Sequence, residues 1–105
     1  MTIIVLNFKT YRESTGVEAL RLAEICEDIS GEYSVQMVVV PQVADIHAIS
    51  KAVKIPVFAQ HVDGVGYGGF TGHITAASLK AAGASGSLIN HSERRLKLAD
   101  IDAAI

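Results

Sequence analysis

Four short runs of apolar residues, rich in valine and isoleucine, recur along the chain with little alternation between apolar and polar positions. Continuous apolar character of this kind is typical of strands that are buried on both faces of a parallel sheet. The pattern therefore predicts four such strands, at Thr2–Asn7, Val35–Val40, Val57–Gln60 and Ser87–Asn90.

Between the first two runs, apolar residues recur at spacings of three and four, which predicts an amphipathic helix. Thr15 and Glu18 have the spacing of a capping box at its start, and Gly31 suits a left-handed residue at its end. The inner face of this helix is expected at Ala19, Leu22, Ala23, Cys26 and Ile29.

Further helices are predicted at Asp45–Val53, before Pro56, and at Thr75–Ala82, before Gly83. A last helix is expected over Asp100–Ile105, with Asp100 as its cap and Ile105 on its buried face. Because no residue closes that helix, we expect the 105 residues to be the first part of a longer chain. The alternation of strand and helix, four times over, predicts an α/β fold with a parallel sheet.

Composition narrows the class of protein. With 105 residues, half of them hydrophobic and 19% charged, the chain is long enough for one core, so residues 1–105 are expected to form part of a single domain. The net charge of −2 and the absence of any basic run beyond Arg94 and Arg95 argue against binding to nucleic acid or to membranes. A single cysteine, Cys26, suggests a reducing, cytoplasmic location.

Polar side chains follow the first and fourth predicted strands. Parallel strands present their carboxyl ends at one rim, where ligands bind, so Asn7, Lys9 and His91 are expected near one another. Lys9 is a fixed positive charge for an oxyanion or phosphate, and His91 can donate a hydrogen bond or move a proton. Ser92 and Glu93 are expected to begin a helical turn. A solvated loop lysine and a structural histidine are the alternative interpretations.

Four short strings, in their order along the chain, resemble the triosephosphate isomerase family. The asparagine before His91, together with short helices, resembles the archaeal branch of that family. The resemblance implies a TIM (β/α)8 barrel, of which this chain supplies about the first four β/α units. The strings are Asn7-Phe8-Lys9, Phe58-Ala59-Gln60, Phe70-Thr71-Gly72 and the run from Asn90 through His91, Ser92, Glu93 and Arg94 to Arg95.

The resemblance also implies site residues. Asn7 and Lys9 are expected to contact a phosphorylated triose, and Lys9 to supply positive charge. His91 is expected to act as the electrophile on the carbonyl oxygens. Glu93 is expected to orient this cluster by pairing with Lys9. Thr71 is expected near the tip of a loop that inserts into a partner subunit of a homo-oligomer.

The implied activity is the interconversion of dihydroxyacetone phosphate and glyceraldehyde 3-phosphate through an enediolate, a step of glycolysis and gluconeogenesis. No cofactor or metal is expected. In this family the general-base glutamate belongs to a later strand. We therefore expect the 105-residue chain to be inactive alone and to need the missing C-terminal half of the barrel as its partner.

Two rival signals and one rival function remain open. Gly64, Gly66 and Gly69 spell a dinucleotide-binding fingerprint, but Phe70, Thr71, Gly72 and His73 intervene before the helix expected from Thr75, which weakens this interpretation. A zinc site from His61, Asp63, His73 and His91 lacks helical or tight-turn spacing, so exposed loop positions are favoured for His61 and His73. The rival function is a noncatalytic half-barrel that binds a partner chain or a phosphorylated ligand. Tyr11, Tyr33 and Tyr67 show no informative spacing.

Overall fold

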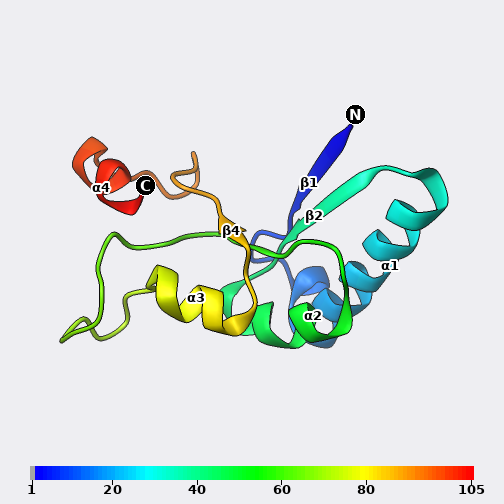
Figure 1. The fold of residues 1–105 in the computed structure, drawn as a ribbon, viewed down its shortest axis with the longest axis horizontal. Coiled ribbons are helices and arrows are strands. Elements are labelled where there is room, and N and C mark those ends of the chain that lie inside the picture. The colour runs from blue at the N-terminus through cyan, green and yellow to red at the C-terminus, as the bar shows by residue number, and fades with distance from the viewer. Residues whose placement is uncertain (1) are drawn as a thin grey trace.

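The structure, a computed structural model, describes residues 2–105, so Met1 of the expected domain lies outside the described residues. Strands and helices alternate along the chain, with two short 3-10 turns, η1 and η2 (Figure 1). The elements are β1 (Ile3–Asn7), η1 (Arg12–Ser14), α1 (Val17–Tyr33), β2 (Gln36–Val40), η2 (Val43–Asp45), α2 (Ile46–Ala52), β3 (Phe58–Ala59), α3 (Ala76–Ala82), β4 (Gly86–Ser87) and α4 (Leu98–Ala104).

All four strands are parallel, as the alternation of elements predicts. β1 pairs with β2 along its whole length, from Ile3 opposite Gln36 onward, and β3 pairs with β4. A single bridge between Val39 and Val57 joins the two pairs. The strands therefore follow the order β1-β2-β3-β4, and residues 2–105 form an open α/β arrangement and not a closed barrel.

The prediction that the first strand is buried on both faces is wrong. Ile3, Ile4 and Val5 are 56%, 42% and 50% exposed. Within the described residues, β1 has a neighbouring strand on one side only, so these side chains lack a second strand to pack against. In contrast, Val39 and Val40 of β2 are fully buried, because β2 lies between two strands.

The last two strands are shorter than predicted. Their ladder covers only Phe58–Ala59 and Gly86–Ser87, where the two segments pair. After β4, the Leu88 N–H still donates to the Ala59 carbonyl oxygen at 2.8 Å. The chain then leaves the extended conformation, because Asn90 has a φ of 68°.

The predicted capping box of α1 is not formed. The N-cap is Gly16, and no side chain accepts a hydrogen bond from the first turn of the helix. The Thr15 hydroxyl instead donates to the Tyr11 carbonyl oxygen at 2.7 Å and accepts from Gln42 Nε2 at 2.9 Å. These contacts turn the Thr15 hydroxyl toward the loop, and the N-cap position is taken by Gly16, so Thr15 does not cap the helix.

The C-terminal end of α1 and both ends of α3 also test the capping rules. Gly31 was expected to end α1, but the helix continues to Tyr33, and Ser34 adopts the left-handed conformation. In α3 the expected caps are present: the Thr75 hydroxyl accepts from the Ser78 N–H at 3.1 Å, and Gly83 has a φ of 109°.

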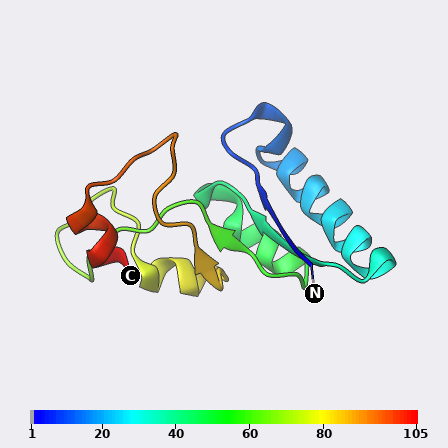
Figure 2. The ribbon, with the colours of Figure 1, turned by 90° about the horizontal axis from the view of Figure 1, so that it is seen from above.

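The core lies between the sheet and helices α1, α2 and α3, on one side of the strands (Figures 1 and 2). The expected inner residue Ile29 is 39% exposed and lies outside it. α4 begins at Leu98, two residues before the expected cap Asp100, and Ile105 is exposed instead of buried. None of the helices in residues 2–105 is long and apolar enough to span a bilayer. The buried core includes Phe8, Ala19, Ala23, Cys26, Met37, Val39, Ile46, Ile49, Val53, Val57, Ala59, Val62 and Leu79.

Candidate active site

A cavity of about 450 Å³ opens at the carboxyl ends of the strands. This is the rim where parallel α/β folds bind their ligands. Side chains reach it from the segments that follow β1, β2, β3 and β4. They include Asn7, Lys9, Tyr11, Gln42, Gln60, His61, His91, Glu93 and Arg94.

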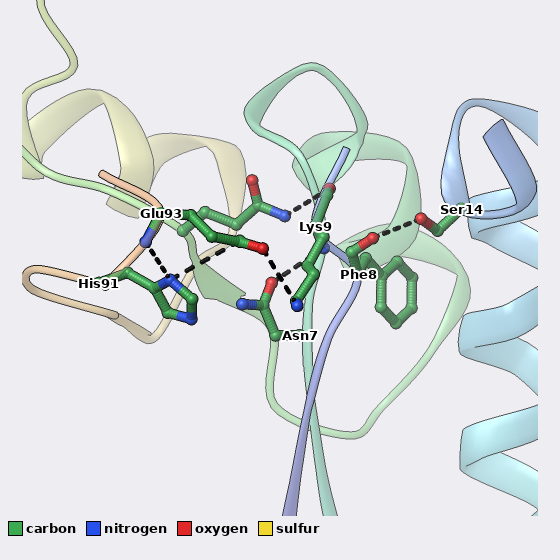
Figure 3. A network of polar contacts seen from close by, with 7 residues as sticks. Asn7, Phe8, Lys9, Ser14, His91 and Glu93 are labelled. Carbon is green, nitrogen blue, oxygen red and sulfur yellow. Dashed lines mark hydrogen bonds and ion pairs between the residues drawn. The ribbon is translucent and has the colours of Figure 1, made fainter. Parts of the chain in front are cut away.

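The backbone at the end of β1 is held by four hydrogen bonds. The Phe8 N–H donates to the Val40 carbonyl at 3.0 Å, and the Phe8 carbonyl accepts from the buried Ser14 hydroxyl at 2.5 Å. The Lys9 N–H donates to Asn7 Oδ1 at 2.9 Å, and the Lys9 carbonyl accepts from Gln60 Nε2 at 2.8 Å. Figure 3 shows the bonds made by Ser14, by Asn7 and by the Lys9 carbonyl.

These contacts hold Lys9 in an uncommon conformation. Its φ is 53°, in the left-handed region that side chains other than glycine rarely adopt. Such strain persists only where the surroundings over-determine the backbone, and here every polar main-chain atom of Phe8 and Lys9 has a partner. The direction of the lysine side chain is therefore set by Asn7, Ser14 and Gln60.

The Lys9 ammonium forms an ion pair with Glu93, with Nζ 3.1 Å from Oε1 (Figure 3). The pKa of Lys9 lies above its ordinary value, first because the Glu93 carboxylate accepts its hydrogen bond and carries the opposite charge, and second because of Tyr11. Both partners are partly exposed, so water and salt screen the pair. The ion pair therefore positions the Lys9 side chain more than it stabilises the fold.

His91 is oriented by the next turn of the chain. The Glu93 N–H donates to His91 Nδ1 at 3.0 Å, so Nδ1 carries a lone pair and this hydrogen bond assigns the ring proton to Nε2. Glu93 Oε2 lies 3.6 Å from the same nitrogen, which is too far for a hydrogen bond. Glu93 thus contacts Lys9 through its side chain and His91 through its backbone.

The segment after β4 is a tight turn and not the expected start of a helix. The Arg94 N–H donates back to the His91 carbonyl at 2.9 Å, and the Leu96 N–H donates to Asn90 Oδ1 at 2.8 Å. A helix would need bonds to carbonyls four residues back. The first helical residue after this turn is Leu98.

The structure thus brings Asn7, Lys9, His91 and Glu93 to one cavity, whereas Thr71 lies on the exposed loop between β3 and α3. The sequence placed Gln60 at the end of a predicted strand, at this rim, but assigned no role to it, to Tyr11 or to Ser14. The Tyr11 ring lies 5.8 Å from Lys9 Nζ, and Ser14 and Gln60 hold the backbone. The sequence signal that could have indicated a role for Gln60 and Tyr11 is their position in the segments that follow strands β3 and β1. No sequence signal indicated a role for Ser14.

His61 is buried, with only 8% of its surface exposed, so the expectation of an exposed loop histidine is wrong. Its Nε2 lies 2.7 Å from Asp63 Oδ1. Asp63 Oδ2 accepts the Ile74 N–H at 2.7 Å, and the Asp63 N–H donates to the Ile74 carbonyl at 2.7 Å. These bonds close the base of the loop. The pKa of Asp63 is lowered, mainly by the Ile74 N–H.

The structure also tests the two rival signals of the sequence, the zinc site and the dinucleotide-binding fingerprint. Within residues 2–105, no group of three histidine, cysteine, aspartate or glutamate side chains is arranged to hold a metal ion. The three glycines Gly64, Gly66 and Gly69 lie in the β3–α3 loop, and α3 starts only at Ala76. A pyrophosphate site needs the glycine turn to run directly into the helix N-terminus, so this geometry disfavours it.

Known proteins of similar sequence agree with the motifs at this rim. A family model described as triosephosphate isomerase matches residues 2–105. The triosephosphate isomerase of Methanothermobacter thermautotrophicus is 57% identical over 103 residues, which is 98% of this chain and 45% of the relative. That of Methanothermus fervidus is 55% identical over 103 residues, 98% of this chain and 46% of the relative.

The triosephosphate isomerase of Methanosarcina barkeri is 49% identical over all 105 residues, which is 47% of that protein. All three relatives are archaeal, as the asparagine before His91 led us to expect. The chain spans a little under half the length of these curated relatives. It belongs to the triosephosphate isomerase family.

Proposed function

We propose that this chain carries the Lys9 and His91 side of the active site of a triosephosphate isomerase. The reaction would interconvert dihydroxyacetone phosphate and glyceraldehyde 3-phosphate. The observation that supports it most is the contact of one residue, Glu93, with both Lys9 and the His91 ring at the edge of one cavity. A fixed cation and an oriented imidazole are what an oxyanion intermediate requires.

In this mechanism a base removes the proton from the carbon next to the carbonyl group. The electron pair of that C–H bond forms the C=C bond of an enediolate, and the carbonyl electrons move to oxygen. The Nε2–H of His91 gives its proton to that oxygen and takes one back from the neighbouring hydroxyl, while Lys9 stabilises the negative charge. The base then returns its proton to the other carbon, which forms the product. Asn7 would hold the substrate beside Lys9.

The carboxylate base would come from a later strand of a complete (β/α)8 barrel, of which residues 2–105 would form about the first four units. Two observations support this arrangement: the four parallel strands with their helices, and relatives about twice as long as this chain. A barrel of this kind needs about 200 residues or more. Alone, the 105-residue chain would be inactive.

The whole protein would be a homo-oligomer that uses the loop between His61 and His73. That loop extends away from the helices and strands (Figure 1) and exposes Tyr67, at 90%, as well as Phe70 and Thr71. Apolar side chains on a protruding loop are typical of an interface. We place the enzyme in the cytoplasm, in glycolysis and gluconeogenesis, without cofactor or metal.

A coupled assay of the full-length protein tests this proposal. Purified protein should convert glyceraldehyde 3-phosphate to dihydroxyacetone phosphate, which a dehydrogenase and NADH then report. No turnover in protein that still binds a phosphorylated triose would favour the noncatalytic half-barrel. The family match over residues 2–105 favours the isomerase over a binding module.

A further inference from the structure

The side chain of Tyr11 lies over the ammonium group of Lys9. The distance from Lys9 Nζ to the ring centroid is 5.8 Å, within the range in which a cation is attracted to an aromatic face. Both residues line the cavity at the strand ends. Tyr11 is 57% exposed within the described residues, so the contact with Lys9 is not forced by close packing around it there.

The main chain of Tyr11 is anchored independently of its ring. Its carbonyl oxygen accepts hydrogen bonds from the Ser14 N–H at 3.1 Å, the Ser14 hydroxyl at 3.2 Å and the Thr15 hydroxyl at 2.7 Å. Gln42 Nε2, from the segment after β2, donates to Thr15 Oγ1 at 2.9 Å. The backbone therefore presents the ring from a fixed point at the mouth of the cavity.

We infer that Tyr11 is a positioning residue for Lys9, which keeps the ammonium at the cavity when a phosphorylated substrate replaces Glu93 as its partner. Lysine has a flexible four-carbon stem, and fixing it costs conformational entropy. A ring that holds the ammonium beforehand lowers that cost on binding. This inference rests on the proposed isomerase function and adds a residue to it.

Kinetics of variants in the full-length protein test the inference. Tyr11→Leu removes the aromatic face and should raise KM about two- to fivefold, the effect expected of an exposed cation–π contact, with a smaller change in kcat. Tyr11→Phe keeps the face and should recover most of the loss. Tyr33→Leu, at an exposed tyrosine of α1 away from the cavity, is the matched control.

A double-mutant cycle tests whether the effect of Tyr11 on the kinetics depends on Lys9. In a Lys9→Met background, Tyr11→Leu should have no further effect on kcat/KM, because the cation is already absent. An equal effect in both backgrounds would overturn the inference. So would an unchanged KM in an active Tyr11→Leu enzyme whose circular dichroism matches the wild type.

A second measurement does not depend on activity. Nitrogen-15 NMR of the Lys9 ammonium group should show a changed chemical shift and a lower titration midpoint in Tyr11→Leu than in wild type, because an aromatic face next to the ammonium group favours its charged form. Identical titrations would overturn the inference. If the wild type lacks isomerase activity, the proposed function fails, and this titration still decides whether Tyr11 positions Lys9.

Discussion

Lys9 Nζ lies 3.1 Å from Glu93 Oε1, and this ion pair connects the loop after β1 with the turn after β4. These loops follow the two outer strands of the described sheet. In a flat sheet, strands separated by three spacings would be about 14 Å apart. Two long side chains can span that distance, so the contact depends on their reach across the carboxyl rim. His91, from the same turn as Glu93, lies at the cavity that Lys9 lines.

Loss of the proposed electrophile, His91, or of the positive charge of Lys9 should reduce catalysis strongly. In the full-length protein, Lys9→Met and His91→Gln should each lower kcat about 10²- to 10³-fold, as expected when a single oxyanion-stabilising donor is removed. Steady-state coupled assays give the change. Lys51→Met, at an exposed lysine of α2, is the control for loss of a positive charge. Near-normal turnover in either site variant would contradict the proposed roles.

Glu93→Gln should move the titration of Lys9 to lower pH, toward its ordinary pKa of 10.5, because the carboxylate is the main cause of the raised value. A raised pKa means that the pair's contribution to stability is fully present below the ordinary value and is lost as the pH rises through the folded-state pKa. NMR titration of the lysine ammonium measures the midpoint. Glu24→Gln on α1 should leave it unchanged, and an unmoved midpoint in Glu93→Gln would refute the assignment.

Asp63→Asn should loosen the loop between β3 and α3, because the amide oxygen accepts the Ile74 N–H more weakly than a carboxylate does. The lowered pKa of Asp63 means that its contribution is present above its ordinary value of 3.8 and is lost as the pH falls through the lower folded-state pKa. Hydrogen exchange of residues 64–73 should be faster in the variant. Asp28→Asn on α1 serves as control, and equal exchange in both would argue against the prediction.

Substitution by alanine should change the free energy of unfolding in opposite directions at two glycines, Gly83 and Gly31. Gly83 has a φ of 109°, and an added Cβ would overlap the Ser50 side chain. Gly83→Ala should therefore lower the free energy of unfolding by about 1–3 kcal/mol. Gly31 lies inside α1 with open space around it, so Gly31→Ala should raise it by about 0.5–1 kcal/mol. Urea denaturation of the full-length protein measures both. Equal effects would show that backbone conformation does not decide the outcome.

A polypeptide limited to these 105 residues should not behave as a sharply folded monomer. Ile3, Ile4 and Val5 are exposed on a strand with one free edge, and such edges recruit other strands. We expect self-association, or a partly molten state that a complementary half-barrel would order, and no isomerase activity above a His91→Ala control. Sedimentation across concentrations and hydrogen exchange measure this. Slow exchange in β1 and β4 of a strict monomer at micromolar concentration would contradict it.

Local patterns in the sequence were sufficient for much of the fold. The apolar run around Val39 identified β2, and Thr75 and Gly83 marked both ends of α3, because periodicity and caps act over a few residues. The same rules failed for Thr15 and Gly31, where a loop contact and a continuing helix overrode the local preference.

For the site, the sequence alone determined which polar residues follow the strands, because the carboxyl ends of parallel strands share one rim. The roles of Asn7, Lys9 and His91 remain predictions drawn from that placement and from the family motifs. Only the tertiary structure decided that Tyr11 lies over Lys9 and that Ser14 holds the backbone beside it. These contacts depend on how the segment between β1 and α1 folds at the carboxyl rim of the sheet, and no spacing along the chain encodes that geometry.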